Sequence, residues 1–96
     1  MLVLITYDVN TETHEGQKRL RRIAKACVNM GQRVQNSVFE CLLNAAELVA
    51  LKYELLEIMD SEQDSLRFYY LGDKYQTKIE CYGIRQGYKP EETLIL

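Results

Sequence analysis

The sequence predicts a single α+β domain in which an antiparallel sheet carries two helices on one face. Apolar runs of strand length alternate with two stretches of helical periodicity, which is the first observation behind this prediction. The second is size, because 96 residues make one domain and not two. The third is composition, since 47% hydrophobic and 27% charged residues are ordinary for a globular protein.

The first half of the chain predicts a strand followed by a helix. Residues 2–7, LVLITY, are apolar at nearly every position, which favours a central strand covered on both sides. A polar loop leads to residues 16–30, where apolar side chains recur at helical spacing and Gly31 follows as a C-cap. The predicted outer face of this helix is basic and carries Lys18, Arg21, Arg22 and Lys25. Arg19 lies at the boundary of the apolar stripe, closer to the sheet.

The second half predicts more strands around a second helix. Residues 33–43 form either one bent strand or two short strands broken near Asn36. Asn44 is a good N-cap for a helix over residues 45–59. The predicted apolar stripe of this helix is broad and runs through Leu48, Val49, Leu51, Leu55, Leu56 and Met59. Strands follow at residues 65–72 and 77–82. This order predicts a ferredoxin-like βαββαβ fold with an extra C-terminal strand.

The C-terminal tail and the small size together indicate a dimer. The tail, YKPEETLIL, ends in apolar residues, and so short a chain buries little of its surface by itself. We therefore treat residues 1–96 as one domain and expect residues 77–96 to contact a second copy.

Several classes of protein are disfavoured by the composition. No apolar stretch reaches 18 residues, so no membrane span is expected, and the short apolar start lacks the features of a signal peptide. Cys27, Cys41 and Cys81 are odd in number and far apart, as expected of reduced thiols in a cytoplasmic protein.

The charge of the chain is divided unevenly along its length. Residues 1–39 hold six bases against three acids, whereas residues 40–96 hold six bases against eleven acids. A basic stretch of this kind is compatible with a local anion-binding surface, and equally with a solvated helix face.

Asp8 stands at the carboxyl end of the first strand, a place where carboxylates often hold hard cations. Taken alone, it fits a turn residue better than a ligand. A two-fold dimer would supply a second carboxylate from the other copy. The single histidine, His14, lies in a polar loop, and the sequence contains no hydrolase elbow and no nucleotide-binding glycine motif.

Three features in order resemble a known family. They are LVLITYDV, the arginine-rich first helix, and the motif R-x-Q-x-S-V-F formed by Arg33, Gln35, Ser37, Val38 and Phe39. In this order and spacing the chain is similar, over nearly its whole length, to the small CRISPR-associated adaptation proteins of the Cas-two family.

The resemblance implies a ferredoxin-like homodimer that takes part in spacer acquisition beside a larger integrase subunit. It also implies a metal-dependent endonuclease acting on double-stranded DNA or RNA, with Mg²⁺ held by Asp8 and its counterpart in the second copy. The catalytic positions implied by the family motif are Asp8, Tyr7, Ser37 and Phe39. The implied phosphate contacts are Arg19, Arg21, Arg22 and Arg33.

Two alternatives stay open beside the nuclease hypothesis. In the first, the dimer is a non-catalytic adaptor that holds duplex DNA between copies of the integrase, and Asp8 is dispensable. In the second, it is a ferredoxin-like dimer that binds a small molecule or a metal ion, which predicts no salt-sensitive binding of duplexes.

Overall fold

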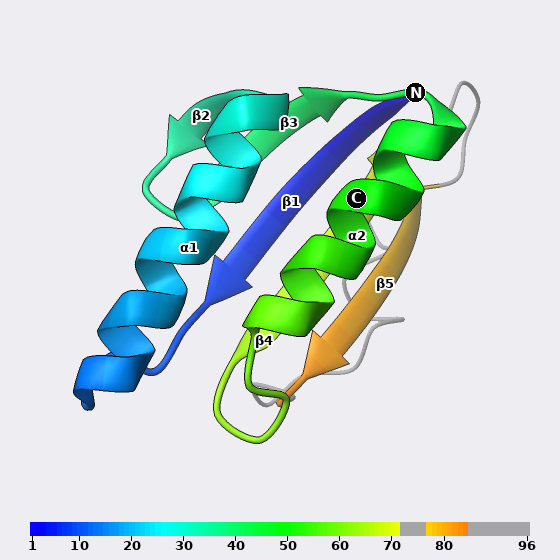
Figure 1. Ribbon diagram of the computed structural model, residues 1–96. Coiled ribbons are helices and arrows are strands. Elements are labelled where there is room, and N and C mark those ends of the chain that lie inside the picture. The colour runs from blue at the N-terminus through cyan, green and yellow to red at the C-terminus, as the bar shows by residue number, and fades with distance from the viewer. Residues whose placement is uncertain (72–76, 85–96) are drawn as a thin grey trace.

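The chain forms one five-stranded antiparallel sheet with two helices packed on one face (Figure 1). The structure is a computed structural model, and it describes residues 1–71 and 77–84. The elements are β1 Leu2–Asp8, α1 His14–Met30, β2 Gln32–Gln35, β3 Val38–Leu42, α2 Ala45–Ile58, β4 Ser65–Leu71 and β5 Thr77–Gly83. The α+β, ferredoxin-like prediction is confirmed.

The sheet order is β2-β3-β1-β4-β5, with β1 at the centre. β1 pairs antiparallel with β3 and with β4, and β5 extends the sheet beyond β4. The open alternative for residues 33–43 is settled as two strands, because β2 and β3 form a hairpin that turns at Asn36 and Ser37.

Both helices begin at residues that satisfy their free backbone N–H groups. Thr13 caps α1, and its side chain accepts a hydrogen bond from the Gly16 amide. Asn44 caps α2 as predicted, in a capping box with Glu47. With Thr13 as its cap, α1 starts at His14, two residues before the predicted residue 16.

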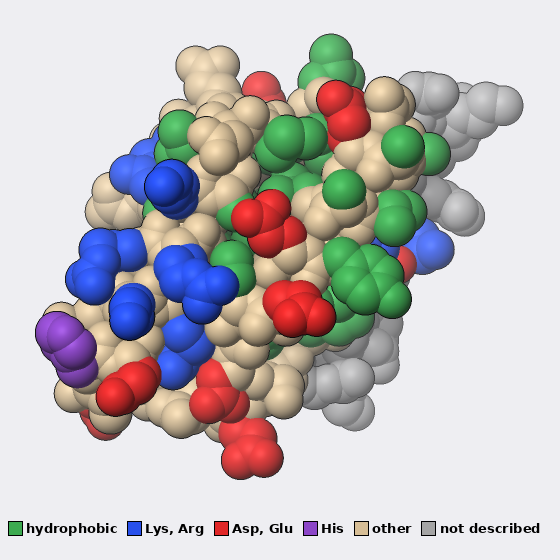
Figure 2. Space-filling view, viewed as in Figure 1, with side chains coloured by type: hydrophobic (Ala, Val, Ile, Leu, Met, Phe, Trp, Pro, Cys, Tyr) green, Lys and Arg blue, Asp and Glu red, His purple; other side chains and the backbone are tan. Residues whose placement is uncertain are grey.

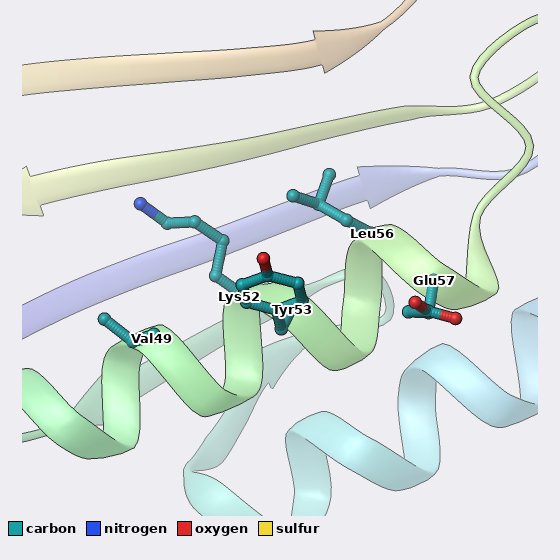
Figure 3. A pocket seen from close by; sticks show the side chains of 5 residues that line it. All are labelled: Val49, Lys52, Tyr53, Leu56 and Glu57. Atoms are coloured by element: carbon teal, nitrogen blue, oxygen red, sulfur yellow. The ribbon is translucent and has the colours of Figure 1, made fainter.

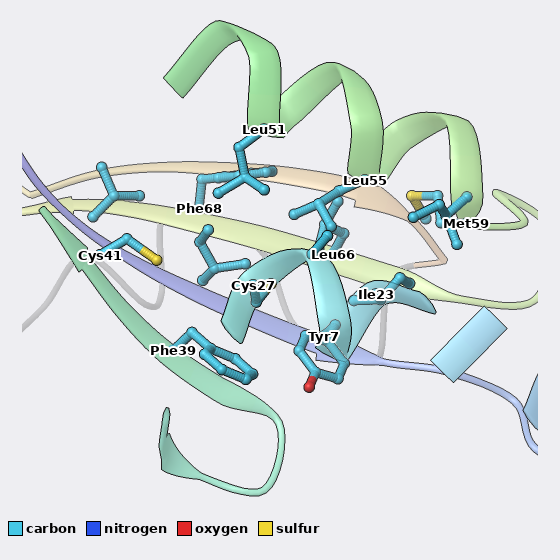
Figure 4. Close-up of a cluster of buried hydrophobic side chains, with 14 of the residues drawn as sticks. Tyr7, Ile23, Cys27, Phe39, Cys41, Leu51, Leu55, Met59, Leu66 and Phe68 are labelled. Atoms are coloured by element: carbon cyan, nitrogen blue, oxygen red, sulfur yellow. The ribbon is translucent and has the colours of Figure 1, made fainter. Parts of the chain in front are cut away.

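The core lies between the helices and the sheet (Figure 4). Because strand side chains alternate between faces, Val3, Ile5 and Tyr7 of β1 point toward the helices. Phe39 and Phe68, from the two strands that flank β1, are fully buried on the same side. Phe39 thus lies on the inner face of β3, whose side chains alternate between the two faces of the sheet.

The buried face of α2 differs from the predicted one. Leu48, Leu51 and Leu55 are buried as expected, but Val49 is 57% exposed and Ile58 takes a core position instead. The helix is apolar around much of its circumference, so periodicity alone does not select the side that meets the sheet.

No helix in the described ranges is long and apolar enough to cross a membrane. The end of the predicted strand at Gly72 and the tail from residue 85 onward lie outside the described residues. The contact of the tail with a second copy therefore stays a prediction.

Candidate nucleic-acid interface and the Asp8 carboxylate

Asp8 lies at the end of the central strand, on the face of the sheet away from the helices. It is the last residue of β1 and pairs with Ser65, the first residue of β4. Its neighbour Tyr7 faces the core and is 5% exposed, so the Asp8 side chain takes the opposite face, where it is exposed to solvent. A carboxylate in this position is anchored by a strand and open to a ligand.

The sheet face that carries Asp8 is rich in apolar side chains. β1 itself and the strands β3, β4 and β5 place apolar side chains on it, as the pairing register shows: Leu2, Leu4, Val38, Leu42, Tyr69, Leu71 and Ile79. Leu42 is 77% exposed and Leu71 is 37% exposed. Within residues 1–71 and 77–84 no helix covers this face (Figure 1), although β1 was predicted to be covered on both sides.

Tyr7, Ser37 and Phe39 meet one another on the inner side of the hairpin turn. The rings of Tyr7 and Phe39 stack with centroids 6.1 Å apart, and the Tyr7 hydroxyl donates to the Asn36 carbonyl at 3.3 Å. The Tyr7 amide donates to the carbonyl of Ser37 at 3.1 Å. This cluster supports the strand that carries Asp8, and its two rings face away from the carboxylate. The catalytic assignment of these three residues stays a prediction.

Arg33 completes this cluster from the edge strand β2. Its guanidinium carbon lies 5.1 Å from the centre of the Phe39 ring, within the range of a cation–π contact. Burial raises the pKa of Tyr7 above its ordinary value, and the nearby Arg33 charge opposes only part of that shift. Tyr7 is therefore a neutral hydrogen-bond donor at physiological pH.

The four predicted arginines are in two different situations. Arg21, Arg22 and Arg33 are exposed. Arg19 is turned inward and forms an ion pair with Asp64, with 2.8 Å between Nε and Oδ2. The guanidinium of Arg19 is therefore already committed to a carboxylate of the protein.

Asp64 is a buried residue that the sequence patterns did not single out. Its side chain is fully buried and accepts hydrogen bonds from Arg19, from the Asn10 amide at 3.0 Å and from the Asp60 amide at 2.9 Å. Burial by itself would raise the pKa of Asp64, but these hydrogen bonds outweigh it and hold the pKa below its usual value. The only sequence signal was the place of Arg19 at the boundary of the helix stripe.

The basic surface consists of Lys18, Arg21, Arg22 and Lys25 on the outer face of α1, all of them exposed. Figure 2 shows Lys and Arg side chains gathered over α1, with acidic and hydrophobic side chains over α2. A groove of about 450 Å³ separates the two helices, with Arg22 and Lys25 on one wall and Glu54 and Glu57 on the other. The acidic wall limits the basic surface on the side of α2.

A second groove, of about 440 Å³, lies along α2 (Figure 3). It is lined by Val49, Lys52, Tyr53, Leu56 and Glu57. The Lys52 amine donates to Glu80 at 2.7 Å, and Tyr70 donates to the same carboxylate oxygen at 2.6 Å. This groove belongs to the helix side of the molecule, so it does not open onto Asp8.

The residues present offer oxygen ligands for a hard cation, but few of them. In the part of the chain that the structure describes, no three His, Cys, Asp or Glu side chains come together in a way that could hold a metal ion. Mg²⁺ keeps several of its waters and often binds through one or two carboxylates, so a single exposed Asp8 per chain is compatible with it.

Comparison with known proteins agrees with this fold. The family described as "CRISPR associated protein Cas2" matches residues 1–79. A protein of Halalkalibacterium halodurans named "CRISPR-associated endonuclease Cas2" is 56% identical over 95 residues, covering 99% of both chains. One of Nitratidesulfovibrio vulgaris, named "CRISPR-associated endoribonuclease Cas2", is 57% identical over 96 residues, covering 100% of this chain and 94% of the other.

A solved structure gives the same picture. The crystal structure of Streptococcus pyogenes Cas2 superposes with a TM-score of 0.71 at 60% identity, covering 78% of this chain and 90% of that chain. The small ferredoxin-like domain is thus shared with a group of CRISPR-associated proteins. The chain belongs to the CRISPR associated protein Cas2 family.

Proposed function

We propose that this chain is a Mg²⁺-dependent endonuclease of the CRISPR adaptation module, which hydrolyses phosphodiester bonds of double-stranded DNA or RNA as a homodimer. The observation that carries the proposal is the exposed Asp8 carboxylate at the end of β1, on a largely apolar sheet face. The relatives named endonuclease and endoribonuclease support the reaction class.

The homodimer is supported by the same sheet face. Side chains such as Leu42 and Leu71 are partly or largely exposed there, and a second copy would remove them from water at about 25 cal/mol per Å² of apolar surface. A two-fold axis near Asp8 would bring two carboxylates into one site. We include residues 77–96 in the contact with the second copy, because this segment ends in apolar residues.

In the reaction, the two Asp8 carboxylates, one from each copy, would hold Mg²⁺. The bound ion would supply Lewis-acid stabilisation of the phosphate and a more acidic water. Arg21 and Arg22 would contact backbone phosphates and orient the duplex without reading its sequence. Arg33, exposed at the hairpin edge, would add a further phosphate contact.

A second candidate function is a non-catalytic adaptor that holds duplex DNA and bridges copies of the integrase subunit. One observation favours it: the basic surface lies on the outer face of α1, whereas the Asp8 carboxylate lies on the opposite side of the sheet. A duplex bound by α1 would then be held at a distance from the carboxylate. Both candidates place the protein in the cytoplasm, where its three free cysteines would remain reduced.

The substitution Asp8→Asn separates the two candidates. The endonuclease proposal expects Mg²⁺-dependent cleavage of duplex DNA or RNA to be lost, while sedimentation shows the same dimer as the parent. Cleavage by Asp8→Asn at the parent's rate would refute the nuclease mechanism. Spacer acquisition in cells that express Asp8→Asn at the parent's frequency would favour the adaptor.

The dependence of binding affinity on salt concentration tests duplex binding itself. Each phosphate contact should contribute about 0.9 to the slope of log affinity against log salt concentration. Binding that does not change with salt would exclude both nucleic-acid functions and favour a small-molecule binding domain.

A further inference from the structure

The Asp64 carboxylate joins three segments that are distant in sequence. It accepts from Nε of Arg19 at 2.8 Å and from Nη2 of Arg19 at 3.3 Å. It also accepts from the amides of Asn10 at 3.0 Å and Asp60 at 2.9 Å. The contacts with Arg19 hold α1, the contact with Asn10 holds the loop after β1, and the contact with Asp60 holds the loop before β4.

These contacts enclose the backbone of Asp8. On one side, Asp8 pairs with Ser65, the residue directly after Asp64. On the other, Asn10 lies two residues beyond Asp8 and donates its amide to Asp64. The segment that carries the Asp8 carboxylate is thus held on both sides by two consecutive residues, Asp64 and Ser65, at the start of β4.

The start of α1 presses on the same loop. A Cβ atom at Gly16 would lie 1.9 Å from the Asn10 carbonyl oxygen, so only glycine allows this approach. Arg19 extends from the second turn of the helix to Asp64 with its side chain 14% exposed. A phosphate that captured Arg19 would leave the fully buried Asp64 carboxylate without its counterion, which is unfavourable.

We infer that Arg19 and Asp64 are a positioning pair that holds the loop of Asp8 in place, and that Arg19 is not a phosphate contact. This inference rests on the proposed function only in taking Asp8 as the metal-binding carboxylate. Neither residue of the pair touches the reacting atoms. Arg19, one of the four arginines predicted to bind phosphate, then has a structural role. The other three, Arg21, Arg22 and Arg33, remain the candidates for contacts with the duplex.

The salt dependence of duplex binding tests the assignment of Arg19. We expect Arg19→Gln to keep the parent's slope of log affinity against log salt. The matched control is Arg21→Gln, two residues further along the same helix and exposed, which should lower the slope by about 0.9. A fall of the same size in Arg19→Gln would overturn the inference.

Amide hydrogen exchange tests the positioning role without activity. In Arg19→Gln and Asp64→Asn we expect the Asn10 and Asp60 amides to exchange at least tenfold faster, with β1 core amides such as Ile5 unchanged. Exchange at the parent's rate in a folded variant would overturn the inference, and so would a uniform acceleration. This measurement decides the matter even if Arg21→Gln leaves the salt slope unchanged, a result that would refute the proposed duplex surface instead.

The Mg²⁺ dependence of cleavage links the pair to Asp8. Arg19→Lys retains the positive charge but loses the two-pronged contact with Asp64. We expect it to raise the Mg²⁺ concentration for half-maximal cleavage several-fold, with a smaller effect on the maximal rate. A merely stabilising contact would leave this midpoint unchanged in the folded variant, and that result would contradict the inference.

Discussion

Replacement of Arg19 by methionine is the most direct test of the energetics at the Asp64 site. The substitution keeps much of the apolar stem of the side chain and removes the guanidinium. It leaves a fully buried carboxylate with only the Asn10 and Asp60 amides as partners. The structure therefore predicts that Arg19→Met causes a large loss of folding stability.

The expected loss follows from burial. Removing one partner of a buried ion pair costs about 3–5 kcal/mol. Arg19 is 14% exposed and two amides remain, so we expect the lower end of this range, about 3 kcal/mol. A domain of this size has about 5–14 kcal/mol in total, so the loss is a large fraction of it.

The assay is urea unfolding at pH 7 and fixed protein concentration, followed by circular dichroism. The double variant Arg19→Met/Asp64→Asn should recover at least about 1 kcal/mol relative to the sum of the single variants, because the uncompensated charge is gone. Additive effects, or a loss below about 1 kcal/mol in Arg19→Met, would refute the reasoning.

The pH dependence supplies a second check on the same pair. Because the pKa of Asp64 is lowered in the folded protein, its contribution to stability is present above the unfolded value of about 3.9 and is lost as pH falls further. The difference between the parent and Arg19→Met should therefore shrink below about pH 4. A difference that stays constant down to pH 2 would contradict this account.

Three further predictions concern Cys27, Gly83 and Glu80. Burial raises the pKa of the Cys27 thiol to about 12, so stability should fall from about pH 8.5 upward, where the unfolded thiol ionises and the folded one does not. In urea unfolding, the stability of Cys27→Ala should fall less steeply with rising alkaline pH than that of the parent. An equally steep fall in both proteins would argue against this prediction. Gly83 has a φ of 89°, and a Cβ there would lie 2.0 Å from the Asp64 carbonyl oxygen. Gly83→Ala should therefore lower the stability by about 2 kcal/mol or more, measured by thermal unfolding. An unshifted melting temperature would contradict this prediction. Glu80→Gln should cost about 1 kcal/mol by urea unfolding, since Lys52 and Tyr70 both donate to that carboxylate; equal stability of variant and parent would refute this.

Local patterns in the sequence were sufficient to predict most of the elements. The apolar run of β1, the periodicity of α1 and the Asn44 cap are properties of neighbouring residues, and each was found where expected. α2 was the exception in detail, because a helix with apolar residues around much of its circumference can turn more than one side to a sheet. Packing against the sheet chose the side with Ile58 and left Val49 exposed.

In the candidate site, too, local sequence patterns predict some features and tertiary packing decides the others. The position of Asp8 at a strand end and the basic stretch of α1 could be predicted from the sequence, and period-two alternation places Tyr7 and Asp8 on opposite faces once the buried face is known. Which face the helices cover is decided by the tertiary structure. For that reason the motif residues Tyr7 and Phe39, close to Asp8 in the fold, point away from it.

The sequence by itself determined the fold class, the family and the carboxylate at the end of β1, because all three depend on order and spacing along the chain. Only the tertiary structure decided that Arg19 is bound to Asp64, 45 residues away. Long-range ion pairs leave no periodic signal, since their formation depends on how helix and sheet pack. The same packing separates the basic surface of α1 from the Asp8 face, and this separation is what the Asp8→Asn experiment addresses.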